Sequence, residues 1–180
     1  MPPPPAARAR LLDAFIEILI ENGERAATLE AVATEAGVSK GGLLYHFGSK
    51  DALVEGLVAY LEELAAADID TMRTAPEGPA AYYLTTSNYA DSPLDRAIVS
   101  TMRLSQGANA RAQEALLRIH HGWMDALADE MGDRTAARMV ALMGDGLYYN
   151  AALSGNTVVA SQQEMNDLLD MVRRITRSEN

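Results

Sequence analysis

Apolar residues recur at helical spacing through almost the whole chain, and this pattern constrains the possible folds more than any other feature. Near the N-terminus, Phe15, Ile16 and Leu19 mark one face of a helix, because residues three and four apart lie on the same side. The sequence lacks the alternation of half-buried strands, and its Asp145-Gly146 pair lies within a helical pattern rather than between strands. We therefore predict an all-α protein.

Capping residues, glycines and prolines divide this pattern into about nine helices. Ser92, Pro93 and Asp95 form the strongest start signal, and residues 74–79, with two prolines and a glycine, form the clearest break. Counted from their capping residues, the expected helices cover residues 7–21, 28–36, 39–46, 49–70, 80–89, 92–106, 109–131, 133–153 and 161–174.

Residues 28–47, with the sequence TLEAVATEAGVSKGGLLYHF, carry the most specific local pattern. Two short helices flank a tight turn at Gly37, where glycine permits the positive φ that a sharp turn needs. Val38 fills the angle between the helices, and Ser39 and Lys40 stand at the N-terminus of the second helix. This arrangement is typical of a helix-turn-helix, whose second helix meets DNA with its N-terminal residues.

The second of these helices is expected to present a polar side to the outside. The residues expected to face outward are Ser39, Lys40, Gly41, Gly42, Tyr45 and His46. Leu44 and Phe47 are expected to point to the core. Two adjacent glycines cost about 1 kcal/mol each relative to alanine in a helix. They indicate either tolerated loop character or a close approach of the backbone to phosphates and base edges.

The run from Leu11 to Leu57 resembles the DNA-binding domain of the TetR family of bacterial transcriptional regulators. Residues 37–53, GVSKGGLLYHFGSKDAL, carry the most specific part of the likeness. The resemblance implies a helix-turn-helix domain of three helices over residues 7–57, followed by a helical domain for ligand binding and dimerisation over residues 58–180. The proline tract within residues 1–6 predicts a disordered arm.

The resemblance also implies a set of DNA contacts. Thr28 and Lys50 correspond to phosphate contacts, and the segment from Ser39 to Leu43 corresponds to the part of the recognition helix that enters the major groove. The full implied set is Thr28, Ser39, Lys40, Gly41, Gly42, Leu43, Tyr45, His46 and Lys50. Many family members have proline where this chain has Gly48, and the recognition helix offers only Lys40 as a long basic side chain.

The charge of the chain is unusual for a DNA-binding protein, because phosphate binding favours lysine and arginine. The net charge is −10, but residues 1–50 contribute only −1, and the remaining acidity lies in residues 51–180. The chain has two lysines, Lys40 and Lys50, and both lie in the segment that resembles the DNA-binding domain. The acidity therefore does not exclude a DNA-binding N-terminal part.

The last two long helices are expected to form the dimer interface that the resemblance implies. A two-fold dimer presents its recognition helices about 34–36 Å apart to a palindromic operator. The candidate interface residues are Met139, Leu142, Gly146, Leu153, Met165, Leu168, Leu169 and Val172. These apolar stripes fit an ordinary intramolecular core equally well.

A pocket for an unknown small-molecule effector is also implied by the resemblance rather than by periodicity. Its candidate residues are Tyr60, Tyr82, Met102, His120, Trp123, Met124, Met143 and Tyr148. Methionine and aromatic residues at helical spacing belong to a core more often than to a pocket. The polar tips of tyrosine and histidine nevertheless supply the convergent hydrogen-bonding groups that a pocket needs.

These observations predict a homodimeric transcriptional regulator, a repressor that a small molecule releases from its operator. The alternatives are a DNA-binding regulator that answers to a protein partner instead, and a small helical enzyme. His121 and Asp125 lie one turn apart, but such a pair alone is a weak metal signal, and no P-loop, GxSxG or dinucleotide motif is present. We expect no catalytic site, no cofactor, no metal and no membrane segment, and we expect the protein in the cytoplasm.

Overall fold

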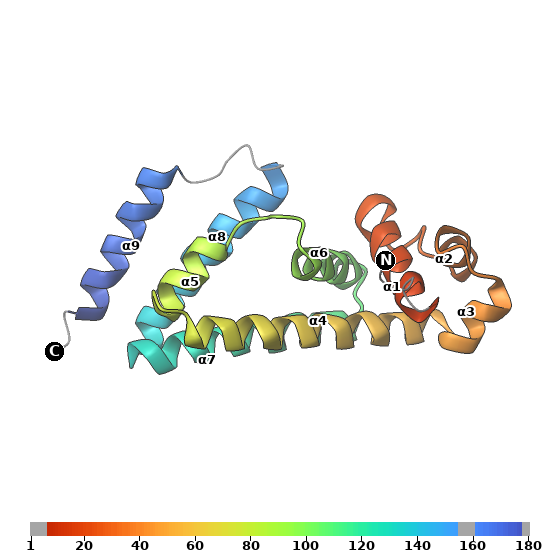
Figure 1. Ribbon diagram of the computed structural model, residues 1–180, viewed down its shortest axis with the longest axis horizontal. Helices are drawn as coiled ribbons and strands as arrows, with labels where there is room; N and C mark the ends of the chain where they lie inside the picture. Colours follow the sequence, from red (N-terminus) through yellow and green to blue (C-terminus); the bar gives the residue numbers. More distant parts are fainter. Residues whose placement is uncertain (1–6, 155–160, 178–180) are drawn as a thin grey trace, which may run out of the picture. The chain divides into compact units, whose positions relative to one another are not determined.

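The computed structural model describes residues 7–154 and 161–177, and this part of the chain contains nine helices and no strand (Figure 1). The helices are α1 (Ala7–Asn22), α2 (Leu29–Glu35), α3 (Lys40–His46), α4 (Lys50–Thr74), α5 (Pro79–Thr86), α6 (Pro93–Gln106), α7 (Ala110–Met131), α8 (Arg134–Ser154) and α9 (Gln162–Arg177). The all-α prediction is confirmed. None of the helices in the described ranges is both long and apolar enough to cross a membrane.

Side-chain caps begin the helices where the sequence predicts them. The hydroxyls of Thr28, Ser39 and Ser49 each accept a hydrogen bond, at 3.1 Å, from the backbone N–H three residues ahead. Ser92 and Asp95 form a reciprocal capping box at the start of α6. Each of these bonds satisfies a backbone donor that the first turn of a helix leaves without a partner. The start of a helix is therefore encoded locally.

Three helix ends differ from the prediction by three or more residues. Helix α4 continues to Thr74 instead of ending at about residue 70, α5 ends at Thr86 instead of Tyr89, and α9 continues to Arg177 instead of ending at about Arg174. At the end of α5, the hydroxyls of Thr86 and Ser87 donate to the carbonyls of Tyr82 and Tyr83. Such side-chain bonds offer the backbone an alternative to further helical bonds, and the chain leaves the helix there. The predicted arm at residues 1–6 and the predicted stop at Gly155 lie outside the described residues.

Contacts divide the chain into two compact units. The first unit comprises residues up to Leu64 together with Asp91–Arg118, and the second comprises Ala65–Ala90 together with residues from Ile119 onward. Within the first unit, α1 packs against α2, α3 and α6. Its core is built mainly from leucines and one phenylalanine without exposed surface: Leu11, Phe15, Leu19, Leu43, Leu53, Leu57, Leu61 and Leu104. The helix-turn-helix and α6 therefore share one body.

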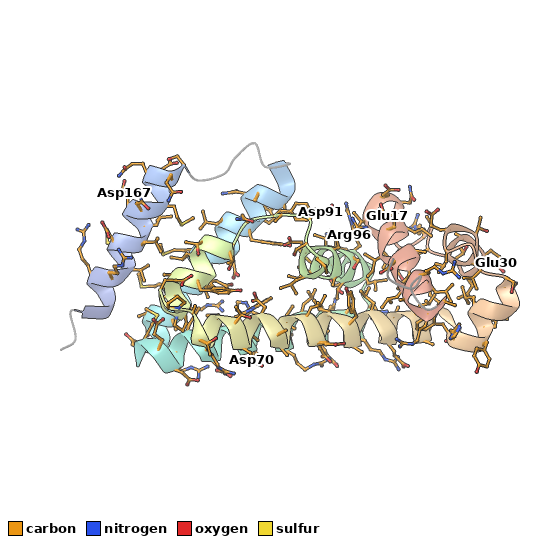
Figure 2. The ribbon with its side chains drawn as sticks, in the orientation of Figure 1. Glu17, Glu30, Asp70, Asp91, Arg96 and Asp167 are labelled. Carbon is orange, nitrogen blue, oxygen red and sulfur yellow. The ribbon has the colours of Figure 1, made fainter. Side chains whose placement is uncertain are left out.

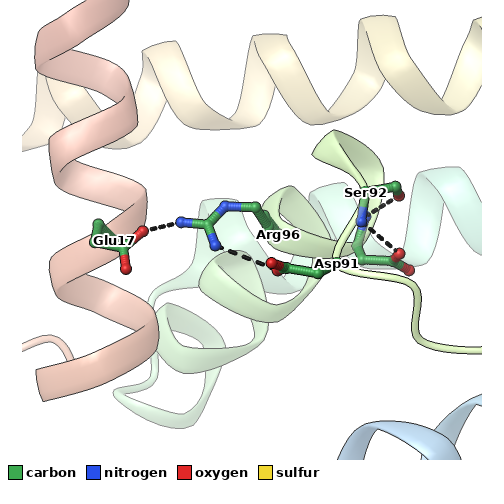
Figure 3. A network of polar contacts seen from close by, with 5 residues as sticks. Glu17, Asp91, Ser92 and Arg96 are labelled. Atoms are coloured by element: carbon green, nitrogen blue, oxygen red, sulfur yellow. Dashed lines mark hydrogen bonds and ion pairs between the residues drawn. The ribbon is translucent and has the colours of Figure 1, made fainter.

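A polar network joins α6 to α1 in this unit (Figure 3). The guanidinium of Arg96, on α6, donates to the carboxylate of Glu17, on α1, and also to Asp91 Oδ1 at 3.2 Å. Asp91 has a φ of 54°, a left-handed conformation that is uncommon for a residue other than glycine. One guanidinium therefore ties together a helix of the N-terminal domain, the start of α6 and the strained residue before it.

The second unit has its own core. Helix α5 packs against α8 and α9, and α8 also packs against α9. Buried residues from the ends of α4 and α7 complete the cluster, which contains Met72, Ala80, Tyr83, Leu84, Met124, Ala126, Leu127, Ala137, Val140, Ala141 and Val172. Gly144 allows the backbone of α8 to approach Tyr83 of α5 closely, because a Cβ at this position would lie 2.3 Å from Cε1 of Tyr83.

Replacement of Leu43 by alanine tests the packing of α3. Leu43 is fully buried, and removal of a buried leucine side chain costs about 2–5 kcal/mol in the free energy of unfolding. The neighbouring Leu44 is exposed, so Leu44→Ala should cost less than about 1 kcal/mol. Denaturant unfolding of both variants measures the difference. Equal losses would contradict the orientation of α3.

Candidate nucleic-acid interface

The turn between α2 and α3 is held by backbone geometry. Gly37 has a φ of +61°, as the sequence predicts, and Val38 N–H donates to the carbonyl of Ala33 at 2.9 Å. A Cβ on Gly42 would lie 2.8 Å from Cγ1 of Val38, whereas Gly41 faces open space. Gly42 is therefore needed for the packing of the turn, and Gly41 is the glycine at which another backbone or a ligand has room to approach.

Helix α3 is oriented differently from the prediction at two adjacent positions. Leu43 is fully buried, whereas Leu44 is 43% exposed, so the expectation that Leu44 points to the core is wrong. Phe47 is buried as expected, and its ring lies against Gly56 of α4, where a Cβ would be 2.8 Å from Cε1. Leu43 and Phe47 lie four residues apart and share one face of the helix. The side chain of Leu43 is therefore enclosed by the protein and is not available to contact DNA.

The outer surface of α3 consists of polar and aromatic groups. Tyr45 is 85% exposed, the largest exposure among the large apolar or aromatic side chains that the structure describes, and its ring meets that of His46 edge to face at 5.1 Å. Ser39, Lys40 and Gly41 are also exposed. The Tyr45 ring therefore lies outside the core and is accessible to a partner.

Both lysines of the chain are paired with glutamates near α2. Lys40 Nζ lies 2.5 Å from Oε1 of Glu30. Glu30 lies in the first turn of α2 and is labelled in Figure 2. Lys50 Nζ donates to the backbone carbonyl of Glu24 at 2.9 Å and lies 3.7 Å from Oε1 of the same residue. The Lys40 ammonium lowers the pKa of the Glu30 carboxyl below its ordinary value, so the carboxylate is ionised at neutral pH.

The first unit contains the N-termini of α2, α3 and α4, and each presents backbone N–H groups. Thr28, Ser39 and Ser49 cap α2, α3 and α4, and Lys50 is the first residue of α4. The N-terminus of a helix favours anions, because its free N–H groups and its dipole both attract negative charge. The guanidinium of Arg8 lies 5.0 Å from the ring centre of Phe47, which packs this arginine of α1 against the end of α3.

A second group of polar and aromatic side chains lies within the second unit. Asp68 accepts hydrogen bonds from Tyr82 Oη and Trp123 Nε1, both at 2.8 Å. Asp145 accepts from Tyr83 Oη at 2.9 Å, and its other oxygen lies 4.0 Å from Nδ1 of His120. We call these six residues the aromatic–carboxylate cluster.

The tyrosines of this cluster remain protonated donors. Burial and the hydrogen bond to Asp68 raise the pKa of Tyr82 to about 12. Burial and the Asp145 carboxylate raise the pKa of Tyr83 well above its ordinary value. Both hydroxyls therefore keep their protons at neutral pH and hold the carboxylates in place.

The structure brings only some of the predicted pocket residues together. Tyr82, His120 and Trp123 belong to the aromatic–carboxylate cluster, whereas Met124 is buried in the core and Met143 packs against it. Tyr148 is half-buried in the second unit. Tyr60 and Met102 belong to the first unit. The predicted set therefore mixes core residues with residues that carry accessible polar groups.

The predicted interface residues also fall into two groups. Met139, Leu142 and Gly146 of α8 are exposed, and they lie on one face because they are three and four residues apart. On α9, Val172 is buried in the core of the same chain, and Met165 and Leu169 pack against that core. Leu168 is half-buried, and the side chain of Leu153 lies outside the described residues.

A cavity of about 210 Å³ lies between α5, α8 and α9. Its lining residues are Leu84, Thr85, Ser87, Asn88, Leu147, Ala151, Gln162 and Met165. Its volume is below the range of about 300–1,000 Å³ that is typical of pockets for drug-sized molecules. Within the residues described, no group of three or more His, Asp or Glu side chains is placed to hold a metal ion.

Comparison with known proteins places this geometry in a family. Residues 11–57 match the profile described as bacterial regulatory proteins of the tetR family, and residues 77–177 match the tetracyclin repressor-like C-terminal domain. These two matches cover the helix-turn-helix and most of the remaining chain. The chain belongs to the TetR family and is a DNA-binding transcriptional regulator.

Relatives and solved structures agree with this assignment. The HTH-type transcriptional regulator BetI from Burkholderia thailandensis is 27% identical, and that from Paraburkholderia phymatum is 29% identical, with 92% of both chains covered in each case. A putative TetR-family regulator from Rhodococcus sp. has a TM-score of 0.70 at 21% identity and covers 94% of this chain and 98% of its own. The multidrug binding protein EbrR complexed with malachite green has a TM-score of 0.71 at 18% identity. The match covers 95% of this chain and 98% of the EbrR chain. The BetI relatives and the Rhodococcus protein are described as transcriptional regulators.

Replacement of Tyr45 by alanine should weaken DNA binding without destabilising the protein. Because this side chain is almost fully exposed, its loss should change the free energy of unfolding by no more than about 0.5 kcal/mol. Leu117→Ala is a suitable control, since Leu117 is an exposed side chain of α7 in the same unit. Fluorescence anisotropy with labelled duplex and thermal unfolding measure the two effects. A folded Tyr45→Ala protein that binds DNA as tightly as the wild type would contradict a role in the interface.

Proposed function

We propose that the protein is a homodimeric repressor that acts in the cytoplasm and leaves a palindromic operator when a small organic molecule binds. Residues 7–57 serve as its DNA-binding domain, and residues 58–180 serve as its regulatory and dimerisation domain. The observation that carries this proposal is the exposed outer surface of α3, with Ser39, Lys40 and Tyr45 outside and Leu43 buried behind them.

The proposed DNA contacts follow from this surface. Lys40 and Gly41 of the N-terminal turn of α3 read the major groove, and Tyr45 and His46 contact it from the other end of the helix. Thr28 and Lys50 bind phosphates beside helix N-termini, where backbone N–H groups add to the attraction. Ser39 and Gly42 hold the geometry of the turn, since the Ser39 hydroxyl accepts from the Gly42 N–H. Leu43 supports this surface from within.

The proposed dimer forms through the exposed apolar face of α8. Met139, Leu142 and Tyr149 each expose about half of their surface, and together with Gly146 they recur along one side of the helix. Gly146 faces open space, which leaves room for the backbone of a second helix. Met171 of α9 is also exposed in the same unit. An apolar stripe of this kind is typical of a helix that packs against another chain.

Leu142→Glu tests the dimer, because a charge in an apolar interface disfavours association. We expect the variant to sediment as a monomer and to lose affinity for a duplex that the wild type selects from a random pool. Leu117→Glu places the same charge on an exposed leucine of α7, and it should leave the dimer intact. Analytical ultracentrifugation reports the masses. A Leu142→Glu protein that remains dimeric would rule out this face of α8.

The proposed ligand site includes the aromatic–carboxylate cluster. It combines the half-buried rings of Trp123 and Tyr82 with the carboxylates of Asp68 and Asp145, a mixture of apolar surface and a few fixed polar groups. The fold is similar to that of EbrR, whose structure holds malachite green. A ligand releases DNA only if it binds the low-affinity conformation more tightly than the DNA-bound one.

Trp123 provides a direct test, because it is the only tryptophan in the chain and belongs to this cluster. Small organic molecules that change its fluorescence should also lower the affinity for the selected duplex. Trp123→Phe should keep the protein folded and abolish the fluorescence signal. Native mass spectrometry of freshly purified protein identifies a retained ligand. Compounds that shift Trp123 emission and leave DNA binding unchanged would contradict release by ligand and favour a regulator that answers to a protein partner.

A further inference from the structure

Lys40 is the only lysine or arginine in α3, and its ammonium group is engaged by Glu30. The other residues of the N-terminal turn, Gly41 and Gly42, carry no side chain that reaches a base or a phosphate. The positive charge of this turn therefore lies where the Lys40 ammonium lies. That ammonium donates a hydrogen bond to the Glu30 carboxylate of α2.

The ion pair joins two helices of the helix-turn-helix. The two residues are ten positions apart, and the turn at Gly37 brings them together across the helix-turn-helix, with Nζ 2.5 Å from Oε1. Each side chain is about two-thirds exposed, so the carboxylate lies on the outer surface with the lysine. A carboxylate there is unfavourable beside DNA phosphates, because like charges repel.

We propose that Glu30 is a positioning residue for DNA specificity: it keeps the Lys40 ammonium away from phosphates and directs it toward base edges. This inference rests on the proposed function of α3 as the recognition helix. A lysine that binds phosphates strengthens binding to every sequence, whereas a lysine that meets base edges strengthens binding to selected sequences. Glu30 thus lowers affinity for unrelated DNA while retaining affinity for the operator.

An exposed ion pair is weak, and this weakness is consistent with the role. Exposed pairs are screened by salt and are readily exchanged. Glu30 therefore does not lock Lys40 in place but lowers the share of time during which its ammonium is free to meet a phosphate.

Glu30→Gln tests the proposal, because glutamine preserves the shape of the side chain and removes its charge. The full chain should bind a mixed-sequence duplex about three to ten times more tightly than the wild type, and the salt dependence should steepen by about one phosphate contact. Affinity for a duplex of equal length, selected by the wild type from a random pool, should change by no more than about twofold. The ratio of the two affinities therefore falls.

Glu35→Gln is the matched control, since Glu35 is an exposed glutamate at the other end of α2. It removes the same charge without releasing Lys40, so its effect on mixed-sequence DNA and on the salt dependence should be smaller. Glu30→Asp keeps the charge but shortens the side chain, and it should give part of the change seen with Glu30→Gln. In a Lys40→Gln background, Glu30→Gln should have no larger effect than Glu35→Gln.

The outcomes separate this inference from the proposed function. If Glu30→Gln and Glu35→Gln behave alike, or if the gain persists without Lys40, the positioning role is overturned although the protein still selects DNA. If the wild type selects no duplex from the random pool, the proposed function itself fails. A role of Glu30 in α2 stability alone would alter thermal unfolding and leave the salt dependence unchanged.

Discussion

Burial of Leu43 and Phe47 determines which side of α3 faces outward. Successive residues of a helix are rotated by about 100°, so the inward position of Leu43 places Tyr45, two residues further on, on the outer surface. A recognition helix of seven residues is too short to hold its rotation by its own hydrogen bonds. Its orientation therefore depends on how α1, α2 and α4 enclose these two side chains.

The same body includes α6, which the sequence assigns to the C-terminal part. Arg96 connects α6 to Glu17 of α1, and a Cβ on Gly107, at the end of α6, would lie against the carboxylate of Glu24. Glu24 also holds Lys50 through its backbone carbonyl. Helix α6 thus contacts α1 directly and is connected to the start of α4 through Glu24 and Lys50.

Helix boundaries were predictable because caps and breakers act over a few residues, as Thr28, Ser39 and Ser92 show. The orientation of α3 was not, because Leu43 and Leu44 are adjacent leucines and a seven-residue helix offers too few turns for periodicity to choose between them. The apolar stripe of α9 left the same ambiguity, and Val172 faces its own core. Ion pairs such as Lys40–Glu30 join residues of different helices, so a local sequence pattern does not predict them.

The negative net charge makes attraction to DNA depend on a few groups near α3. With a net charge of −10, the whole molecule is not drawn to DNA by long-range attraction, in contrast to strongly basic binding proteins. Its two lysines are both engaged by glutamates or by backbone in the structure, and the other basic side chains of residues 7–57 are the exposed arginines Arg8, Arg10 and Arg25. Attraction must then come from short-range groups, such as capped helix N-termini and exposed α3 side chains, which act only when a duplex fits them closely. Discrimination between sequences is a difference of two binding free energies, and short-range groups that act only on a close fit contribute to that difference.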